Sequence, residues 1–212
     1  MNPLIDTRIF LRFIANSMYI FLGLGNKGEE YEKTRHNAGR IVLQEALKKT
    51  GSEWKMDKVL LSQKAKAEIG GKSVLFLLPE TFMNVSGKTA GALKLSEKKA
   101  SELVVLHDEV DMPLGSFKIS FNRGSAGHKG VESVKRALKT EGFIRIRIGI
   151  CPTTPGGKQK KPDHKKFLDF IVGDFKKEEL EKLKKVSKEI FEAMEMIVTE
   201  GKEKAMNVFN AK

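Results

Sequence analysis

Five short polar clusters in the chain each follow an apolar run, and each holds side chains that can bind a ligand or move a proton. They are Asn26 and the clusters at residues 34–37, 82–84, 107–109 and 127–130. Three of the four histidines fall in these clusters. In an open α/β sheet the carboxyl ends of the strands meet at one crevice. We therefore expect the clusters to line a single site.

The residue types in these clusters favour general base catalysis with water as the nucleophile. In such a site a neutral imidazole accepts a proton from water, a carboxylate fixes its tautomer, and amides polarise the carbonyl under attack. His36 and Asp108 supply the base and the orienting acid, and Asn26 and Asn84 supply amides. Covalent acyl transfer is disfavoured, because the chain has no Gly-x-Ser-x-Gly elbow and Cys151 has no neighbouring base. Any one of these residues could equally cap a turn or pack in the core, and it is their shared position after strands that favours a catalytic site.

A metal site and a dinucleotide site each fit part of the pattern. Potential metal ligands occur at His36, His107, Asp108 and His128, but no His-x-x-x-His or comparable ligand spacing supports the site. The glycines at 23, 25 and 28 match a dinucleotide fingerprint and follow a strand-like run. However, residues 29–36 are dense in charge where a Rossmann helix should begin. We predict neither a metal nor a cofactor.

Hydrophobic patterning predicts the elements that must position these residues. Apolar or alternating runs predict strands at 19–24, 73–78, 102–106, 117–121 and 144–150, and the sequence at 69–72 predicts a hairpin turn. Helical spacing predicts helices at 38–49, 90–95, 130–138 and from 177 to about 198. Alternating strands and helices predict one α/β domain with a twisted mixed, largely parallel sheet flanked by helices. We expect the C-terminal amphipathic helix to pack over the entrance of the site.

Composition limits the partners and the compartment. The chain has 212 residues and a formal charge of +12, from 39 basic and 27 acidic residues, which favours a polyanionic partner such as nucleic acid. The single Cys151 cannot form an intramolecular disulfide and fits a reducing compartment. No apolar run reaches 18 residues, so no membrane span is expected. Residues 1–17 could be a presequence, an ordered extension or the product of a misplaced start before Met18, and we favour the last two.

Four sequence blocks resemble the bacterial peptidyl-tRNA hydrolase family. They are FLGLGNKGEEY at 21–31 with TRHNAG at 34–39, PETFMNVSG at 79–87, HDEVDMPLG at 107–115, and GHKG at 127–130 with FIRIRIG at 143–149. The resemblance covers residues 18–212 and leaves out residues 1–17. It implies a monomeric, cytoplasmic, cofactor-free domain that acts on peptidyl-tRNA during translation. The reaction would cleave the ester between a peptide and the 3′-terminal ribose of tRNA.

The resemblance also implies roles for individual residues. His36 corresponds to the family's catalytic base and Asp108 to the acid that orients it. The positions that correspond to the family's substrate-binding residues are Asn26, Tyr31, Met83, Asn84 and Lys129. Those that correspond to its tRNA-phosphate contacts are Lys118 and Arg147. We also consider Arg123 and the lysine-rich loop at 158–166 as tRNA contacts, although the loop lysines could simply be solvated.

Three departures from the family pattern affect this interpretation. Lys129 stands where the family normally has Asn, and an ammonium donates hydrogen bonds but cannot accept them. Residues 122–126 hold fewer glycines than the family pattern, and Ser120 stands where a second basic residue is common. These changes bear on the geometry of the groove, and Lys129 leaves open a non-catalytic RNA-binding module on the same fold, as in related plant organelle splicing factors. Retention of His36 and Asp108 favours the enzyme.

Overall fold

The computed structural model describes residues 18–211, so the extension considered above, at residues 1–17, lies outside the described residues. In the described part of the chain a seven-stranded sheet has the order β2-β3-β4-β1-β5-β7-β6. Its strands are β1 Ile20–Gly23, β2 Lys55–Asp57, β3 Ser62–Ile69, β4 Lys72–Pro79, β5 Leu103–Pro113, β6 Phe117–Phe121 and β7 Ile144–Cys151. The mixed sheet predicted from sequence is confirmed.

The parallel strands form the centre of the sheet and the antiparallel strands its two margins. Parallel pairs join β4 to β1, β1 to β5, and β5 to β7. Antiparallel pairs join β2 to β3, β3 to β4, and β6 to β7. Three pairings are thus parallel and three antiparallel, and of the described strands only β3 and β6 run opposite to the others, so the sheet is mixed and largely parallel. The predicted hairpin lies between β3 and β4, where Gly70 and Gly71 have φ of 56° and 73°, as a tight hairpin turn requires.

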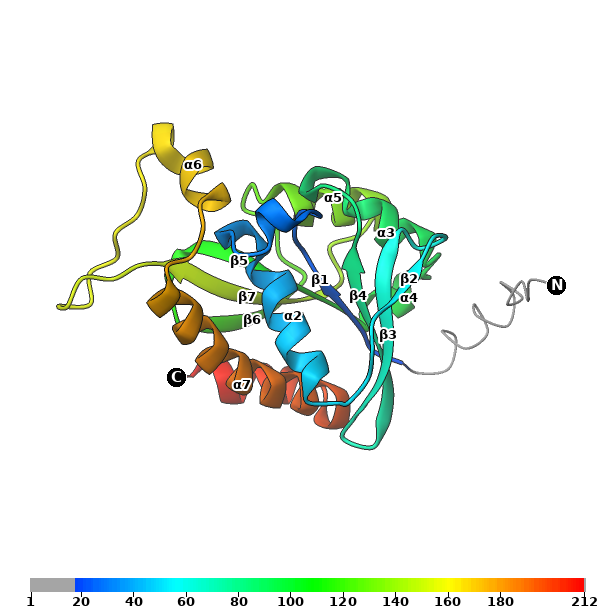
Figure 1. The fold of residues 1–212 in the computed structure, drawn as a ribbon. Helices are drawn as coiled ribbons and strands as arrows, with labels where there is room; N and C mark the ends of the chain where they lie inside the picture. Colours follow the sequence, from blue (N-terminus) through cyan, green and yellow to red (C-terminus); the bar gives the residue numbers. More distant parts are fainter. Residues whose placement is uncertain (1–17, 212) are drawn as a thin grey trace.

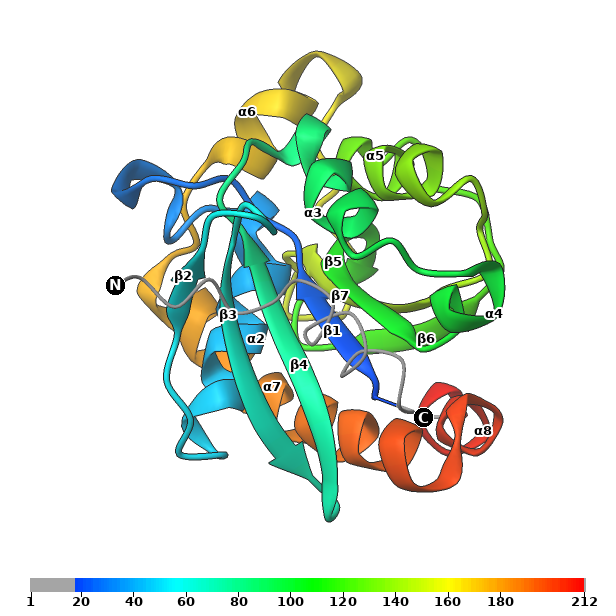
Figure 2. The same ribbon diagram turned by 90° about the vertical axis from the view of Figure 1, so that its right-hand side faces the viewer.

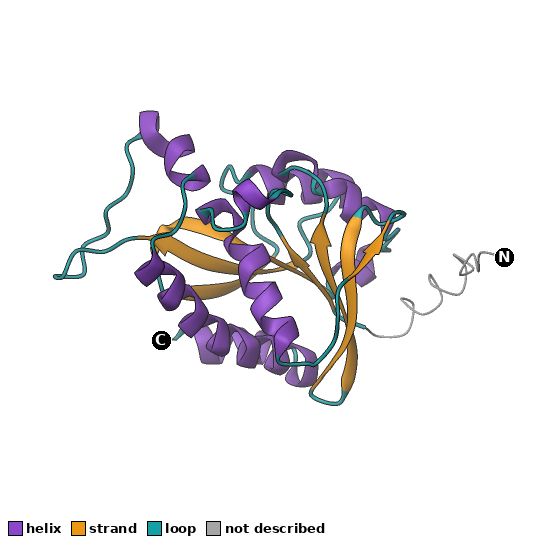
Figure 3. Cartoon of the chain, in the orientation of Figure 1, coloured by secondary structure: helices purple, strands orange, loops and turns teal. Residues whose placement is uncertain are grey.

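Helices cover both faces of the sheet (Figures 1 and 3). One face packs against α2 Ala38–Lys48, α7 Lys177–Glu200 and α8 Lys202–Asn210, and the opposite face packs against α3 Gly87–Ala92 and α5 Lys129–Leu138 (Figure 2). The remaining helices are α4 Glu97–Ala100, α6 Phe167–Val172 and the short 3-10 turns η1 Glu29–Tyr31, η2 Arg35–Asn37, η3 Met83–Val85 and η4 His164–Lys166. Between residues 18 and 211, no helix has the length and apolar character needed to cross a bilayer.

The C-terminal helix packs on the sheet rather than over the site, so that prediction was wrong. The apolar side chains of α7, including Leu183, Ile190 and Met194, are buried in the core that α2 also covers. Instead, α6 lies beside the site, at the end of the long loop that projects from the domain (Figure 1). The strand predicted at 102–106 is also longer than expected, because β5 continues through Asp108 to Pro113 alongside β7.

Two glycines bring α2 into close contact with the central strands. A Cβ on Gly39, in the first turn of α2, would lie 2.2 Å from the carbonyl oxygen of Leu106 on β5. A Cβ on Gly23 would lie 2.9 Å from the carbonyl oxygen of Gly39. Gly23 therefore serves helix–strand packing, which accounts for the first glycine of the fingerprint without a nucleotide. Since Gly39 follows His36 by three residues and Leu106 precedes Asp108 by two, this contact also sets the distance between those side chains.

We predict that Gly39→Ala destabilises the protein by about 1–3 kcal/mol or more, because the added methyl meets a backbone oxygen that no rotamer change can move. Gly91→Ala, in helix α3, is the matched control, because among the described residues a Cβ there would meet just the Cβ of Ala137 on α5, at 3.7 Å. The control should be neutral or slightly stabilising, since Ala is the better helix former. Urea unfolding of both variants measures the difference. Equal stability of the two would contradict the close-packing account.

Candidate active site

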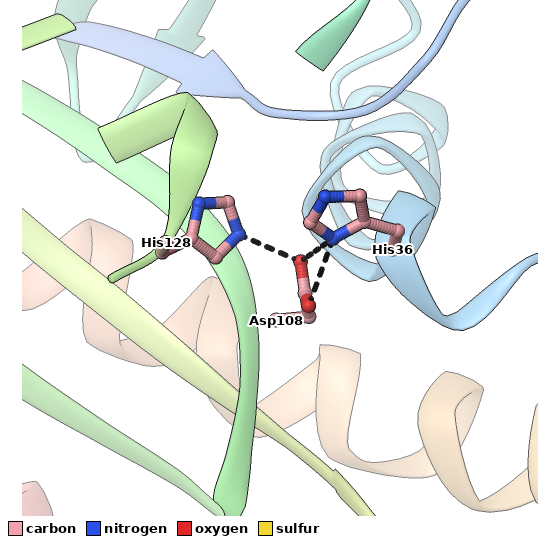
Figure 4. A group of neighbouring side chains, drawn as sticks. All are labelled: His36, Asp108 and His128. Carbon is pink, nitrogen blue, oxygen red and sulfur yellow. Dashed lines mark hydrogen bonds and ion pairs between the residues drawn. The ribbon is translucent and has the colours of Figure 1, made fainter. Parts of the chain in front are cut away.

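The structure brings His36 and Asp108 together although 72 positions separate them in the chain. His36 lies in η2, directly before α2, and Asp108 lies within β5. The Nδ1 of His36 is 3.0 Å from both carboxylate oxygens of Asp108 (Figure 4). Both residues are buried, with exposed fractions of 6% and 5%. Because Nδ1 donates to the carboxylate, the other ring nitrogen, Nε2, carries no proton in the neutral ring and is able to accept one.

A second imidazole, that of His128, also donates to Asp108. His128 is the N-cap of α5, and its Nδ1 accepts the backbone N–H groups of Gly130 and Val131 at 3.2 and 3.3 Å. Nδ1 therefore carries no hydrogen, and the proton of the ring is on Nε2. This Nε2 lies 2.9 Å from Oδ1 of Asp108 (Figure 4). The sequence pattern predicted His128 as part of the site and as a potential metal ligand, but not as a hydrogen-bond donor to Asp108, which lies 20 positions away.

Burial and charge act in opposite directions on these groups. Burial alone would raise the pKa of Asp108, but the two imidazoles hold that pKa well below its ordinary value. Burial lowers the pKa of His36, yet the charge of Asp108 and its hydrogen bond outweigh burial and raise the pKa above 6.5. The Lys129 ammonium opposes this rise. The carboxylate therefore stays ionised beside His36 and stabilises the imidazolium that proton transfer would create.

Two asparagines, Asn26 and Asn37, pair next to His36, since Asn37 is the following residue of η2. The backbone N–H of Asn26 donates to Oδ1 of Asn37, and the backbone carbonyl of Asn26 accepts from Nδ2 of Asn37. The side-chain Oδ1 of Asn26 accepts the backbone N–H of Met83 at 2.8 Å. These bonds use the Oδ1 of Asn26 and leave its side-chain NH₂ available to a ligand. Asn84 is exposed in η3, whereas the side chain of Met83 is buried in the core beneath Gly130. The Tyr31 ring meets the exposed Phe82 ring edge-on, with centroids 6.4 Å apart.

A cavity of about 470 Å³ opens beside the histidines. Its polar wall contains His36, Asp108, His128 and Lys129, and α6 contributes an apolar wall of Phe167, Leu168 and Ile171. Of the predicted substrate-binding residues, only Lys129 lines this cavity. Asn26, Tyr31, Met83 and Asn84 are not among the residues that line it. The arrangement therefore presents an Asp108-bound imidazole to a cavity with one polar and one apolar wall.

Comparisons with known proteins agree with this geometry. A family model described as peptidyl-tRNA hydrolase matches residues 20–212. The chain belongs to the peptidyl-tRNA hydrolase family. It is 37% identical to the peptidyl-tRNA hydrolase of Thermodesulfovibrio yellowstonii over 91% of this chain and 99% of that protein. It is 36% identical to that of Methylacidiphilum infernorum, over 91% and 98% of the two chains. The crystal structure of the Acinetobacter baumannii peptidyl-tRNA hydrolase superposes with a TM-score of 0.80 at 28% identity, covering 92% of this chain and 95% of that one.

The cluster of His36, Asp108 and His128 also has the composition of a metal site, and its ligand atoms lie within 4.8 Å of one another. A metal would have to replace the proton on the Nε2 of His128. That proton would then move to Nδ1, which faces the N–H donors of Gly130 and Val131. The Nδ1–H of His128 would then face the N–H groups of Gly130 and Val131 with no acceptor among them, which is unfavourable. The start of α5 thus favours the hydrogen-bonded form of the trio over metal ligation in this family member.

His107 is a packed residue rather than a substrate ligand. It is 1% exposed, its Nδ1 donates to the carbonyl oxygen of Asp108 at 2.7 Å, and its ring meets that of His128 at 4.7 Å between centroids. Burial and the neighbouring His128 lower its pKa well below 6.5. Its Nε2 has no hydrogen-bond partner within the described part of the chain. His107 therefore favours the neutral form and packs its ring against that of His128.

The residues predicted to contact tRNA phosphate lie on neighbouring strands. Lys118 on β6 pairs in register with Arg147 on β7, and the Lys118 side chain is exposed. Arg147 donates to Glu109 through Nε and Nη2, at 3.0 and 2.9 Å, so part of its charge is balanced. Ser120 on β6, where a second basic residue is common in the family, is buried and pairs in register with Arg145 on β7.

We predict that NMR titration of the His36 ring gives a pKa above 6.5 in the wild type and below 6.5 in Asp108→Asn. The substitution removes the charge that raises the pKa and leaves burial and Lys129, which lower it. Lys129→Met is the complementary control, and it should raise the pKa of His36 further. An unchanged titration in Asp108→Asn would contradict the proposed coupling.

Proposed function

We propose that this protein hydrolyses peptidyl-tRNA, with His36 as the base that activates water. The observation that carries the proposal is the buried His36–Asp108 pair, in which the Nδ1–H is bound to the carboxylate and Nε2 is left to accept a proton. Membership of the peptidyl-tRNA hydrolase family and the names of its relatives support this substrate. The proposal requires no metal or cofactor, and we place the protein as a monomer in the cytoplasm, where translation supplies the substrate.

In the proposed reaction the Nε2 of His36 takes a proton from water as the water oxygen attacks the ester carbonyl. Asp108 holds the ring in the required tautomer and stabilises the imidazolium. The carbon–oxygen bond to the 3′-terminal ribose then breaks, and the Nε2–H of His36 returns the proton to the ribose oxygen. The products are a tRNA with a free 3′-terminal hydroxyl and a peptide carboxylic acid, which releases the second water-derived proton to solvent and becomes a carboxylate.

Substrate binding uses the surfaces on the two sides of His36. The free NH₂ of Asn26 and the exposed amide of Asn84 hold the groups next to the ester, and Asn84 or a backbone N–H stabilises the oxyanion. Tyr31 and the backbone of Met83 border the groove for the peptide and the tRNA 3′ end. Lys129 reaches the same cavity as His36 and can donate to substrate oxygens.

The alternative of a non-catalytic RNA-binding module is less well supported. Such a module has no need to bury a carboxylate against two imidazoles, an arrangement that must offset the desolvation of the charge. Here the pair is intact and borders an open cavity. The basic surface at Lys118 is compatible with either function and does not discriminate between them.

His36→Ala should lower the rate of peptide release from a model peptidyl-tRNA by roughly 10²–10⁴-fold, the usual contribution of a positioned general base. tRNA binding should be retained, because phosphate contacts lie elsewhere on the surface. Single-turnover release and a filter-binding assay measure the two effects separately. Release at a rate near that of the wild type would refute the assigned role of His36.

Lys118→Ala should weaken tRNA binding and reduce the slope of log affinity against log salt by about one, since each neutralised phosphate releases counterions. Lys182→Ala is a suitable control, because Lys182 is exposed on α7, which covers the opposite face of the sheet. The control should leave both quantities unchanged. Identical salt slopes for the two variants would argue against phosphate contact at Lys118.

A further inference from the structure

The Asp108 carboxylate accepts hydrogen bonds from imidazoles on either side. Oδ1 of Asp108 lies 3.0 Å from Nδ1 of His36 and 2.9 Å from Nε2 of His128, and Oδ2 lies 3.0 Å from Nδ1 of His36 (Figure 4). The two imidazole rings lie 5.0 Å apart between centroids. Asp108 is therefore fixed by one ring that faces the proposed chemistry and one that begins a helix.

Both ring nitrogens of His128 have hydrogen-bond partners, whereas a helix cap needs one acceptor atom. Capping of α5 uses only Nδ1, which accepts the N–H groups of Gly130 and Val131. Ser, Thr, Asp and Asn are the preferred residues at such a position. Imidazole differs from them in carrying a second nitrogen on the far side of the ring, and here that nitrogen reaches the carboxylate. The cap itself fixes which nitrogen holds the proton.

We propose that His128 is a positioning residue for the hydrolytic reaction, whose Nε2–H holds Asp108 in the orientation that His36 requires. The inference rests on the proposed function, because it assigns His128 a part in the same reaction. The helix start acts through the tautomer: two backbone N–H groups keep Nδ1 unprotonated, so Nε2–H always points to Asp108. Without this donor the carboxylate is held by His36 alone and is free to rotate.

The donor also moderates the effect of Asp108 on His36. The positive end of the Nε2–H dipole lies against Oδ1 and offsets part of the negative charge that His36 experiences. Removing it should therefore raise the pKa of His36. The other charged or titratable groups that surround the trio are Lys129 on α5, His107 and Glu109 on β5, Arg145 on β7, and Asp111, Lys161 and His164 around the cavity.

Two substitutions separate the cap from the donor. His128→Asn keeps a good N-cap acceptor but is too short to reach Asp108. His128→Gln has a side-chain NH₂ that can reach Asp108, but Gln is a poor N-cap. The experiment measures peptide release against pH, the NMR titration of His36, and thermal melting for both variants and the wild type.

We expect His128→Asn to release peptide at least ~10-fold more slowly, because misplacing a catalytic group by about 1 Å can cost on the order of 10²-fold. Its His36 should titrate at higher pH than in the wild type, and the acid limb of release should move in the same direction. His128→Gln should stay closer to the wild type in rate and titration although it melts at lower temperature.

A purely structural role predicts the opposite order, with the better-capped Asn variant near the wild type and the Gln variant impaired. That order, or rate losses in both variants that simply follow melting temperature, would overturn the inference. Failure of the wild type to release any peptide would instead refute the proposed function. The His36 titration would still test the inference in that case, because an unchanged pKa in His128→Asn would exclude the donor role.

Discussion

The site depends on a carboxylate that has been taken out of water. A buried charge is strongly unfavourable unless donors replace its hydration. Asp108 meets this condition with two imidazole N–H groups, from η2 and from the start of α5. The carboxylate in turn fixes both rings. Because both imidazoles donate hydrogen bonds to the carboxylate, the site can keep the negative charge of Asp108 next to a neutral His36 ring. The same bonds leave the three side chains little room to rearrange.

This arrangement requires three distant segments to meet with little tolerance. Helix α2 packs so closely on β5 that a Cβ on Gly39 would clash with the carbonyl oxygen of Leu106. This close contact sets the distance of His36 from β5. β5 continues past Leu106 because β7 stays paired with it, with Asp108 opposite Ile148. The backbone of residues 173–175 bonds to that of residues 33–35, which holds the His36 turn from the opposite side. A change in any of these contacts would alter the distance between base and carboxylate.

Sequence patterning predicted the features that depend on local periodicity and on side-chain type. The β3–β4 hairpin, the helix that begins at Ala38 and the mixed sheet follow from apolar spacing and from turn glycines, and the structure confirms them. The proximity of His36 to Asp108 was inferred from their positions after strands and from the family resemblance, and the structure places them in contact. Their roles in catalysis are still predictions.

Features set by tertiary contacts were not predictable in the same way. The apolar stripe of α7 showed that one face is buried but not which surface covers it, so α7 was placed over the site that α6 borders. The length of β5 depends on its pairing with β7. Ser120 is buried where β6 pairs with β7, next to Arg145, and spacing along β6 does not specify this neighbour. His128 was recognised as a candidate, yet its role follows from the direction of one ring nitrogen, which spacing along the chain does not specify.

The most direct test of the central claim is the pH dependence of single-turnover peptide release by the wild type and by Asp108→Asn. If Asp108 orients His36 and raises its pKa, wild-type release should fall as the pH drops through a value above 6.5. The variant should show a much lower plateau with its acid limb at lower pH. Acid limbs at the same pH and similar plateaus in both proteins would show that the carboxylate does not act on the base, and would contradict the account.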